Sequence, residues 1–122
     1  MKLHLTTAEN LHLITGYGAG YCEINRQRYL ASLIVMPQQL ILDWQVSKFA
    51  DLNAQSFEQL IALKPEVILL GTGEKHLFLQ PKISAPLTQN GISLECMTTA
   101  AACRTYNILM NEGRTVAAML IV

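Results

Sequence analysis

A thiol, a guanidinium and a carboxamide fall within one short stretch of this chain, at Cys103, Arg104 and Asn107. Thr99 and three alanines come just before them, a composition typical of a helix that begins there, with Thr99 as the expected N-cap. At about 100° per residue, Arg104 and Asn107 fall on one narrow polar strip of this helix. A helix N-terminus offers free N–H groups and a partial positive charge, and Arg104 adds a bidentate donor one turn along. These residue types at this spacing suit a small anion, such as a carboxylate or phosphate.

A second candidate segment, Gly71 to Gly73, ends another apolar run. Ligands of open α/β sheets collect beyond the carboxyl ends of parallel strands, so this segment is expected to lie beside the helix start. The expected binding residues are therefore Gly71, Thr72, Gly73, Thr99, Arg104 and Asn107. Two plainer interpretations stay open: the polar strip is ordinary solvent-facing surface, and the two glycines form a tight turn. A nucleotide site is disfavoured, because His76 occupies the place of a third fingerprint glycine and the P-loop ending is absent.

Cys103 is a candidate reactive thiol, because a helix N-terminus and an adjacent arginine lower the pKa of a thiol. His76 would serve as its base if the glycine loop folds over the helix. The opposing interpretation places Cys103 on the apolar face as a small buried hydrophobe. No Cys-x-x-Cys motif is present, so we expect no catalytic residue and no disulfide among Cys22, Cys96 and Cys103. The cysteines and histidines lack metal-ligand spacing, so we expect no metal and no cofactor.

The elements that position these residues divide into two halves. Closely spaced apolar segments with turn residues between them predict antiparallel strands in the first half. These strands are expected at Leu11–Thr15, Tyr21–Ile24, Tyr29–Met36 and Leu40–Trp44, with a hairpin tip at Asn25-Arg26. From residue 53 the pattern alternates between helix and strand, as in parallel βαβ units. Helices are expected from the capping box at Ser56 to Leu63, over Ser84–Asn90 and from Thr99 to Glu112; strands are expected at Val67–Leu70, Ile92–Cys96 and Thr115–Ile121. The predicted fold class is therefore α/β.

Composition narrows the classes of protein. The 122 residues predict one domain, 1–122; 51% are hydrophobic and 15% are charged, which excludes a disordered chain. Nine basic residues balance nine acidic ones, which argues against nucleic acid as a partner. The longest apolar run, Val116 to Val122, is far too short to cross a bilayer, so we expect no membrane insertion. A polar N-terminus and unpaired cysteines predict a cytoplasmic location.

Several motifs of the C-terminal half also resemble a known family. They are Met97-Thr98-Thr99, Ala101 to Asn107, Glu112-Gly113-Arg114 and Val116-Ala117-Ala118. The resemblance is to a small single-domain family whose mitochondrial member is an assembly factor of respiratory complex I and whose bacterial members are largely of unknown function. It implies three layers around a mixed central sheet. It also implies a non-enzymatic accessory role through protein contacts, with respiratory complex subunits among the partners.

The competing function class is a small-anion or metabolite site, in an enzyme or a sensor, at the carboxyl edge of the parallel strands. The two classes differ in the surface they require. A small-molecule site needs Thr99, Arg104 and Asn107 to line a concave pocket, whereas a flat surface favours protein contacts.

Overall fold

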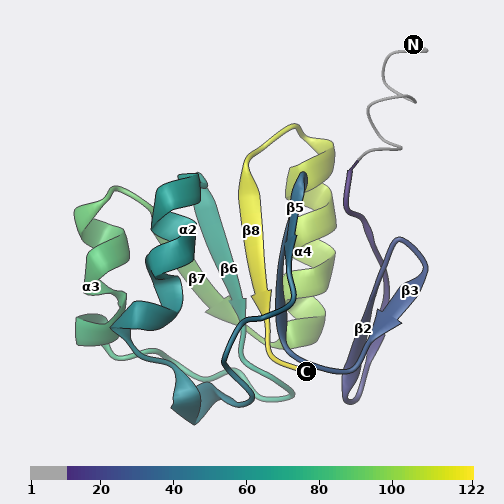
Figure 1. Cartoon of the computed structure of the whole chain (residues 1–122), viewed down its shortest axis with the longest axis horizontal. Coiled ribbons are helices and arrows are strands. Elements are labelled where there is room, and N and C mark those ends of the chain that lie inside the picture. The colour runs from purple at the N-terminus through teal and green to yellow at the C-terminus, as the bar shows by residue number, and fades with distance from the viewer. Residues whose placement is uncertain (1–10) are drawn as a thin grey trace.

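The computed structural model describes residues 11–122, and its strands form two sheets (Figure 1). The smaller sheet is antiparallel and consists of β1 (Ile14–Gly18), β2 (Tyr21–Ile24) and β3 (Gln27–Tyr29). The larger sheet has the spatial order β5 (Gln39–Ile41), β4 (Leu33–Met36), β8 (Val116–Leu120), β6 (Val67–Gly71) and β7 (Ser93–Met97). Strands β8, β6 and β7 run parallel, and β4 and β5 are antiparallel additions. The expected mixed central sheet is thus confirmed.

Helices cover both faces of the central sheet. Helix α4 (Thr99–Asn111) packs on β6 and β8 from one face, and β1 lies against the same helix. The opposite face is covered by α2 (Glu58–Leu63), α3 (Pro81–Gln89) and the short 3₁₀ turns η1 (Phe49–Asp51) and η2 (Ala54–Phe57). This arrangement confirms the expected three-layer α/β fold.

Burial on both faces explains the continuous apolar runs of the central strands. Every residue of β4, β6 and β8 is buried. Alternate residues point to opposite faces of a strand, so Leu69 joins the core under α4 while Ile68 and Leu70 join the core under α2 and α3. A strand covered on both sides therefore carries no polar alternation.

The first half of the chain departs from the expected strands in three places. The run Tyr29–Met36 is divided between the two sheets, with the exposed Leu30 lying between β3 and β4. Strand β1 begins at Ile14 and continues to Gly18, beyond the expected end at Thr15, and β5 ends at Ile41 instead of Trp44. The hairpin tip at Asn25-Arg26 is confirmed, since both residues have positive φ, as a two-residue type I′ turn requires.

The helix boundaries also differ in detail. Ser56 is not the N-cap of α2: Asn53 caps η2, and Ser56 closes the capping box as its third residue. Helix α3 begins at Pro81, three residues earlier than expected, because proline fits the first turn of a helix. Gly91 follows that helix with φ of +70°, as expected of a residue just past a helix end.

The three parallel strands end at one edge of the sheet. Gly71 at the end of β6 is in register with Met97 of β7 and with Leu120 of β8. The segments that follow these three strands therefore meet, and they form the candidate site.

Candidate functional site: the strand-end pocket

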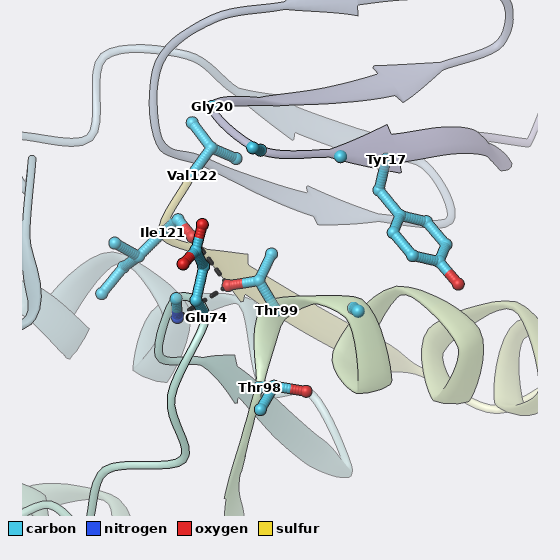
Figure 2. Close-up of a pocket in the computed structure, with 11 residues that line it drawn as sticks. Tyr17, Gly20, Glu74, Thr98, Thr99, Ile121 and Val122 are labelled. Atoms are coloured by element: carbon cyan, nitrogen blue, oxygen red, sulfur yellow. Dashed lines mark hydrogen bonds between the residues drawn. The ribbon is translucent and has the colours of Figure 1, made fainter.

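A pocket of about 390 Å³ opens where the parallel strands end, and we call it the strand-end pocket (Figure 2). Its walls come from the segments after β6, β7 and β8, from the end of β1 and from the turn between β1 and β2. The lining residues are Tyr17, Gly18, Ala19, Gly20, Gly73, Glu74, Thr98, Thr99, Ala100, Ile121 and Val122. Two expected site residues, Gly73 and Thr99, are therefore in the pocket wall.

Thr99 connects all three strand ends, although it is not the helix cap. The N-cap of α4 is Thr98, whose side-chain oxygen accepts a hydrogen bond from the N–H of Ala101 at 3.2 Å. The Thr99 hydroxyl instead accepts from the N–H of Gly73 at 2.8 Å and donates to the carbonyl of Ile121 at 2.7 Å. The expected cap was thus displaced by one residue, because the tertiary contacts of Thr99 occupy its hydroxyl.

Gly71 and Thr72 do not line the pocket, but they hold neighbouring segments of its wall together. A Cβ on Gly71 would approach Cα of Thr99 to 2.9 Å, so only glycine lets helix α4 pack this closely on β6. Thr72 is buried, and its hydroxyl accepts from the N–H of Leu77 at 3.1 Å and lies 3.1 Å from the carbonyl of Met97. Both residues thus hold the loop after β6 against the start of α4.

The helix start has little free capacity for an anion. The N–H of Thr99 donates to the carbonyl of Gly73 at 2.9 Å, and the N–H of Ala101 is used by the cap. The first three N–H groups of α4 belong to Thr99, Ala100 and Ala101. Of these, the N–H of Ala100 has no hydrogen-bond partner within residues 11–122, and Ala100 lines the pocket. Glu74 also lines the pocket, and its carboxylate opposes a negative ligand. The electrostatics are therefore less favourable to an anion than the sequence suggested.

The polar strip of α4 divides into a surface residue and a structural residue. Arg104 is exposed, and its Nη1 donates to the hydroxyl of Tyr17 at 2.9 Å just outside the strand-end pocket. Asn107 faces the small sheet: its amide nitrogen donates to the carbonyl of Ile14 at 2.7 Å, and its amide oxygen accepts from the N–H of Ile14 at 3.0 Å. Asn107 therefore continues the hydrogen bonding of β1 and fastens it to the helix.

Cys103 is buried in the core between α4 and the sheets. Burial raises the pKa of its thiol to about 12, and neighbouring Cys22 contributes in the same direction, more than offsetting the lowering by Arg104. A nucleophilic thiol needs the opposite shift. His76, the candidate base, stacks on Phe78 with ring centroids 4.4 Å apart and lines a different groove. The arrangement thus supplies no activated thiol.

Several residues of the pocket wall were missed by sequence reasoning. Tyr17 and Gly18 end β1, Ala19 and Gly20 form the turn to β2, and Glu74 follows the expected loop directly. The alternating glycines at 16, 18 and 20 were a visible signal of an unusual turn. Their position across from α4 was not, because it depends on how β1 packs on the helix.

Residues 11–122 contain no group of three or more histidine, cysteine, aspartate or glutamate side chains that could hold a metal ion. None of the helices in the same part of the chain has the length and hydropathy needed to span a bilayer.

The sequence matches a known protein family over most of its length. Residues 14–121 match the family described as "Protein of unknown function (DUF498/DUF598)". The chain belongs to this family.

Relatives include NADH dehydrogenase [ubiquinone] 1 alpha subcomplex assembly factor 3 from Bos taurus, which is 33% identical over 88% of the chain. This match spans 59% of the bovine protein, so the chain corresponds to somewhat over half of that relative's length. The 13 kDa major membrane protein of Francisella tularensis is also 33% identical, over 86% of each sequence.

A solved structure supports the fold. The crystal structure of a Bordetella parapertussis protein is 41% identical, with a TM-score of 0.86 over 91% of this chain and 95% of that one. The resemblance noted from the C-terminal motifs is therefore confirmed, and it extends to the N-terminal strands.

Proposed function

We propose that this chain is a non-enzymatic accessory protein that assists the assembly of a respiratory complex by binding one or more of its protein components. The single observation that carries the proposal is the relationship to complex I assembly factor 3, which covers 88% of the chain. Because the chain spans only part of that relative, the role is proposed for the shared domain.

The chemistry of the expected site supports a role without catalysis. The Cys103 thiol is buried with a raised pKa. The Thr99 hydroxyl forms hydrogen bonds with backbone groups of Gly73 and Ile121. The Asn107 amide forms hydrogen bonds with the backbone of Ile14. Groups that are held in structural hydrogen bonds are poorly placed to act on a substrate. We therefore infer a structural role for Thr99 and Asn107.

Exposed apolar side chains support the protein-contact part of the proposal. Phe78 is 78% exposed, Leu30 is 75% exposed, and Ile108 and Leu42 are more than half exposed. Aromatic and aliphatic side chains of this kind supply the buried anchors of protein interfaces.

Deletion of the gene in its source cell tests the proposal. We expect less assembled NADH:quinone oxidoreductase on native gels, accumulation of its subcomplexes, and rescue by the wild-type chain. Serine variants of Phe78, Leu30, Ile108 and Leu42, made one at a time, should retain the fold because these side chains are exposed. At least one should fail to rescue. An unchanged amount of the assembled complex in the deletion strain would refute the proposed role.

A second candidate function is the binding of a small metabolite in the strand-end pocket. Its volume of about 390 Å³ falls within the range of about 300–1,000 Å³ of ligand sites. Thr99 lines this pocket, whereas Arg104 and Asn107 do not, so the pocket meets only part of the expected geometry. Amide NMR titrations with phosphate, acetate and ethylammonium separate the charge classes. Saturable shifts at Ala100 and Glu74 would support this candidate, and flat titrations would remove it for these three probes.

A further inference from the structure

Among residues 11–122, strand β7 leaves one edge of the central sheet without a pairing strand. It is the last strand in the order of the sheet, and β6 is its one partner in the described part of the chain. The carbonyl of Met97 accepts from the N–H of Thr72 at 2.8 Å, which places the backbone groups of Met97 on the β6 side. Alternate residues of a strand direct their backbone groups to opposite sides, so those of Leu94 and Cys96 point to the outer edge. No segment within residues 11–122 pairs with them.

A groove of about 700 Å³ runs along this edge, and we call it the β7 groove. It lies between β7, the polar side of α3 and the loop before α3. Its lining residues are His76, Phe78, Leu79, Ser84, Thr88, Gly91, Ile92, Ser93, Leu94, Glu95 and Cys96. The edge therefore has room beside it, and an exposed aromatic ring forms one wall.

The backbone of β7 determines what conformation would fit this groove. Unpaired N–H and C=O groups at an edge accept an extended segment as an added strand. The five residues of β7 span about 16 Å at about 3.3 Å per residue, enough for a peptide of similar length. An extended segment would satisfy the outward groups of Leu94 and Cys96, which a helix would not.

Charge then selects between partners. Glu95 is exposed at the middle of β7, and no lysine or arginine of residues 11–122 lines the groove. One alternative partner is β7 of a second copy, paired antiparallel about a two-fold axis at the middle of the strand. The two Glu95 side chains would then lie opposite each other, and like charges in such a pair are destabilising. A segment with lysine or arginine at that position is complementary instead.

Side-chain alternation fixes the pattern on either side of this charge. Leu94 and Cys96 point to the face that carries the core under α3, whereas Glu95 points to the other face. A paired strand follows the same alternation, so the residues flanking its basic residue would lie on the side of Phe78. Phe78 is 78% exposed and supported by the His76 ring, so it favours apolar neighbours.

We propose that the outer edge of β7 binds an extended segment of a partner protein in which a basic residue, flanked by apolar residues, lies beside Glu95. This inference rests on the proposed function, because it names the surface through which that function would act. It adds the backbone conformation and the residue pattern of the partner.

The test is an amide NMR titration of the whole chain with the peptide acetyl-Thr-Val-Lys-Val-Thr-amide. We expect saturable shifts confined to residues 76–79 and 91–97. Two N-methylated peptides provide the matched control, one methylated at both valine nitrogens and the other at the lysine and second threonine nitrogens. In either strand direction only one alternate set of amides faces β7, so one peptide should lose binding and the other should keep it.

Substitutions of the charged residue Glu95 and of Phe78 in the groove wall test the two side-chain contacts separately. Glu95→Lys should weaken binding of the lysine peptide about two- to fivefold and favour the matching glutamate peptide. Phe78→Ala should weaken both peptides, while Leu30→Ala, another exposed apolar site, should weaken neither. Shifts that are absent, spread elsewhere or equally affected by both methylation patterns would overturn the inference. Concentration-dependent shifts of β7 without peptide would show pairing with a second copy and would overturn it as well.

The cellular assay keeps the two proposals apart. If the peptide does not bind and a Glu95→Lys chain still rescues respiratory complex assembly, the proposed function stands and the β7 surface is refuted. If the peptide binds as expected while the deletion strain assembles the complex normally, the surface stands and the proposed function is refuted.

Discussion

Thr99 and Gly73 hold each other through two hydrogen bonds. The N–H of Gly73 donates to the Thr99 hydroxyl at 2.8 Å, and the N–H of Thr99 donates to the Gly73 carbonyl at 2.9 Å. The same hydroxyl donates to Ile121, so one side chain connects the ends of β6 and β8 to the start of α4. These bonds therefore join three segments of the pocket wall, at Gly73, Thr99 and Ile121.

Removal of this hydroxyl should be costly. Thr99→Val keeps the shape but leaves the N–H of Gly73 and the carbonyl of Ile121 without their partner, so the free energy of unfolding should fall by about 2–3 kcal/mol. Thr98→Ala removes only the cap and should cost about 1 kcal/mol. Urea unfolding measures both, and Thr99→Ser, which retains a hydroxyl, is the control. Equal losses for Thr98→Ala and Thr99→Val would contradict the assignment of roles.

Gly71 should not tolerate a side chain. The Cβ of Gly71→Ala would approach backbone Cα of Thr99 to 2.9 Å, so we expect a loss of about 1–3 kcal/mol from forced displacement of α4. Gly16→Ala is the control, because its Cβ meets nothing closer than a Glu23 oxygen at 3.4 Å. Thermal unfolding of the two variants should differ, and equal midpoints would argue against close packing at Gly71.

The two residues of the polar strip should respond differently to alanine. Asn107→Ala leaves the N–H and carbonyl of Ile14 unpaired in a partly buried site, at a cost of about 1–3 kcal/mol. Arg104→Ala removes an exposed contact with Tyr17 and should change stability by about 0.5 kcal/mol or less. If the arginine belongs to a binding surface, Arg104→Ala weakens that binding while the fold remains intact. A circular dichroism melt in which Arg104→Ala is the less stable variant would reverse these assignments.

Thiol reactivity should follow burial. Burial raises the pKa of Cys103 to about 12 and that of Cys22 to about 11, so both are almost entirely protonated at pH 8. Cys96 is only partly buried and should be alkylated first. Peptide mapping after brief iodoacetamide treatment of the native protein checks the order, and intact mass should show three free thiols. Rapid, selective labelling of Cys103 would restore the nucleophile hypothesis.

Glu66 should make a contribution to stability that depends on pH. Its carboxylate accepts from the N–H of Thr115 and from the side chain of Arg114, and these bonds lower its pKa below the ordinary 4.5. A lowered folded-state pKa stabilises the fold above pH 4.5, and this contribution is lost as the pH falls through the folded-state value. The stability difference between wild type and Glu66→Gln should therefore be largest near neutral pH and shrink in acid. A difference independent of pH would disprove this linkage.

Several local elements and their burial could be predicted from the pattern of apolar residues and turn residues alone. The runs at Val67–Leu70 and Thr115–Ile121 are uniformly apolar because both faces of the sheet are covered, and this pattern is visible without coordinates. Asn25-Arg26 indicated its turn, because a two-residue hairpin requires positive φ at both positions. Alternation of helix and strand placed the ends of β6 and β7 at one edge, where the pocket was found.

The hydrogen-bond partners of the polar side chains depend on contacts between segments that are distant in sequence. Asn107 and Ile14 lie 93 positions apart, and Thr99 and Ile121 lie 22 apart, so no local pattern predicts that they bond. The strand expected over Tyr29–Met36 is divided between two sheets for a similar reason, since its apolar run matched either sheet. Periodicity records which side of an element is apolar, whereas a hydrogen-bond partner is set by the packing of segments distant in sequence. The candidate site was therefore predictable in place but not in the roles of its residues.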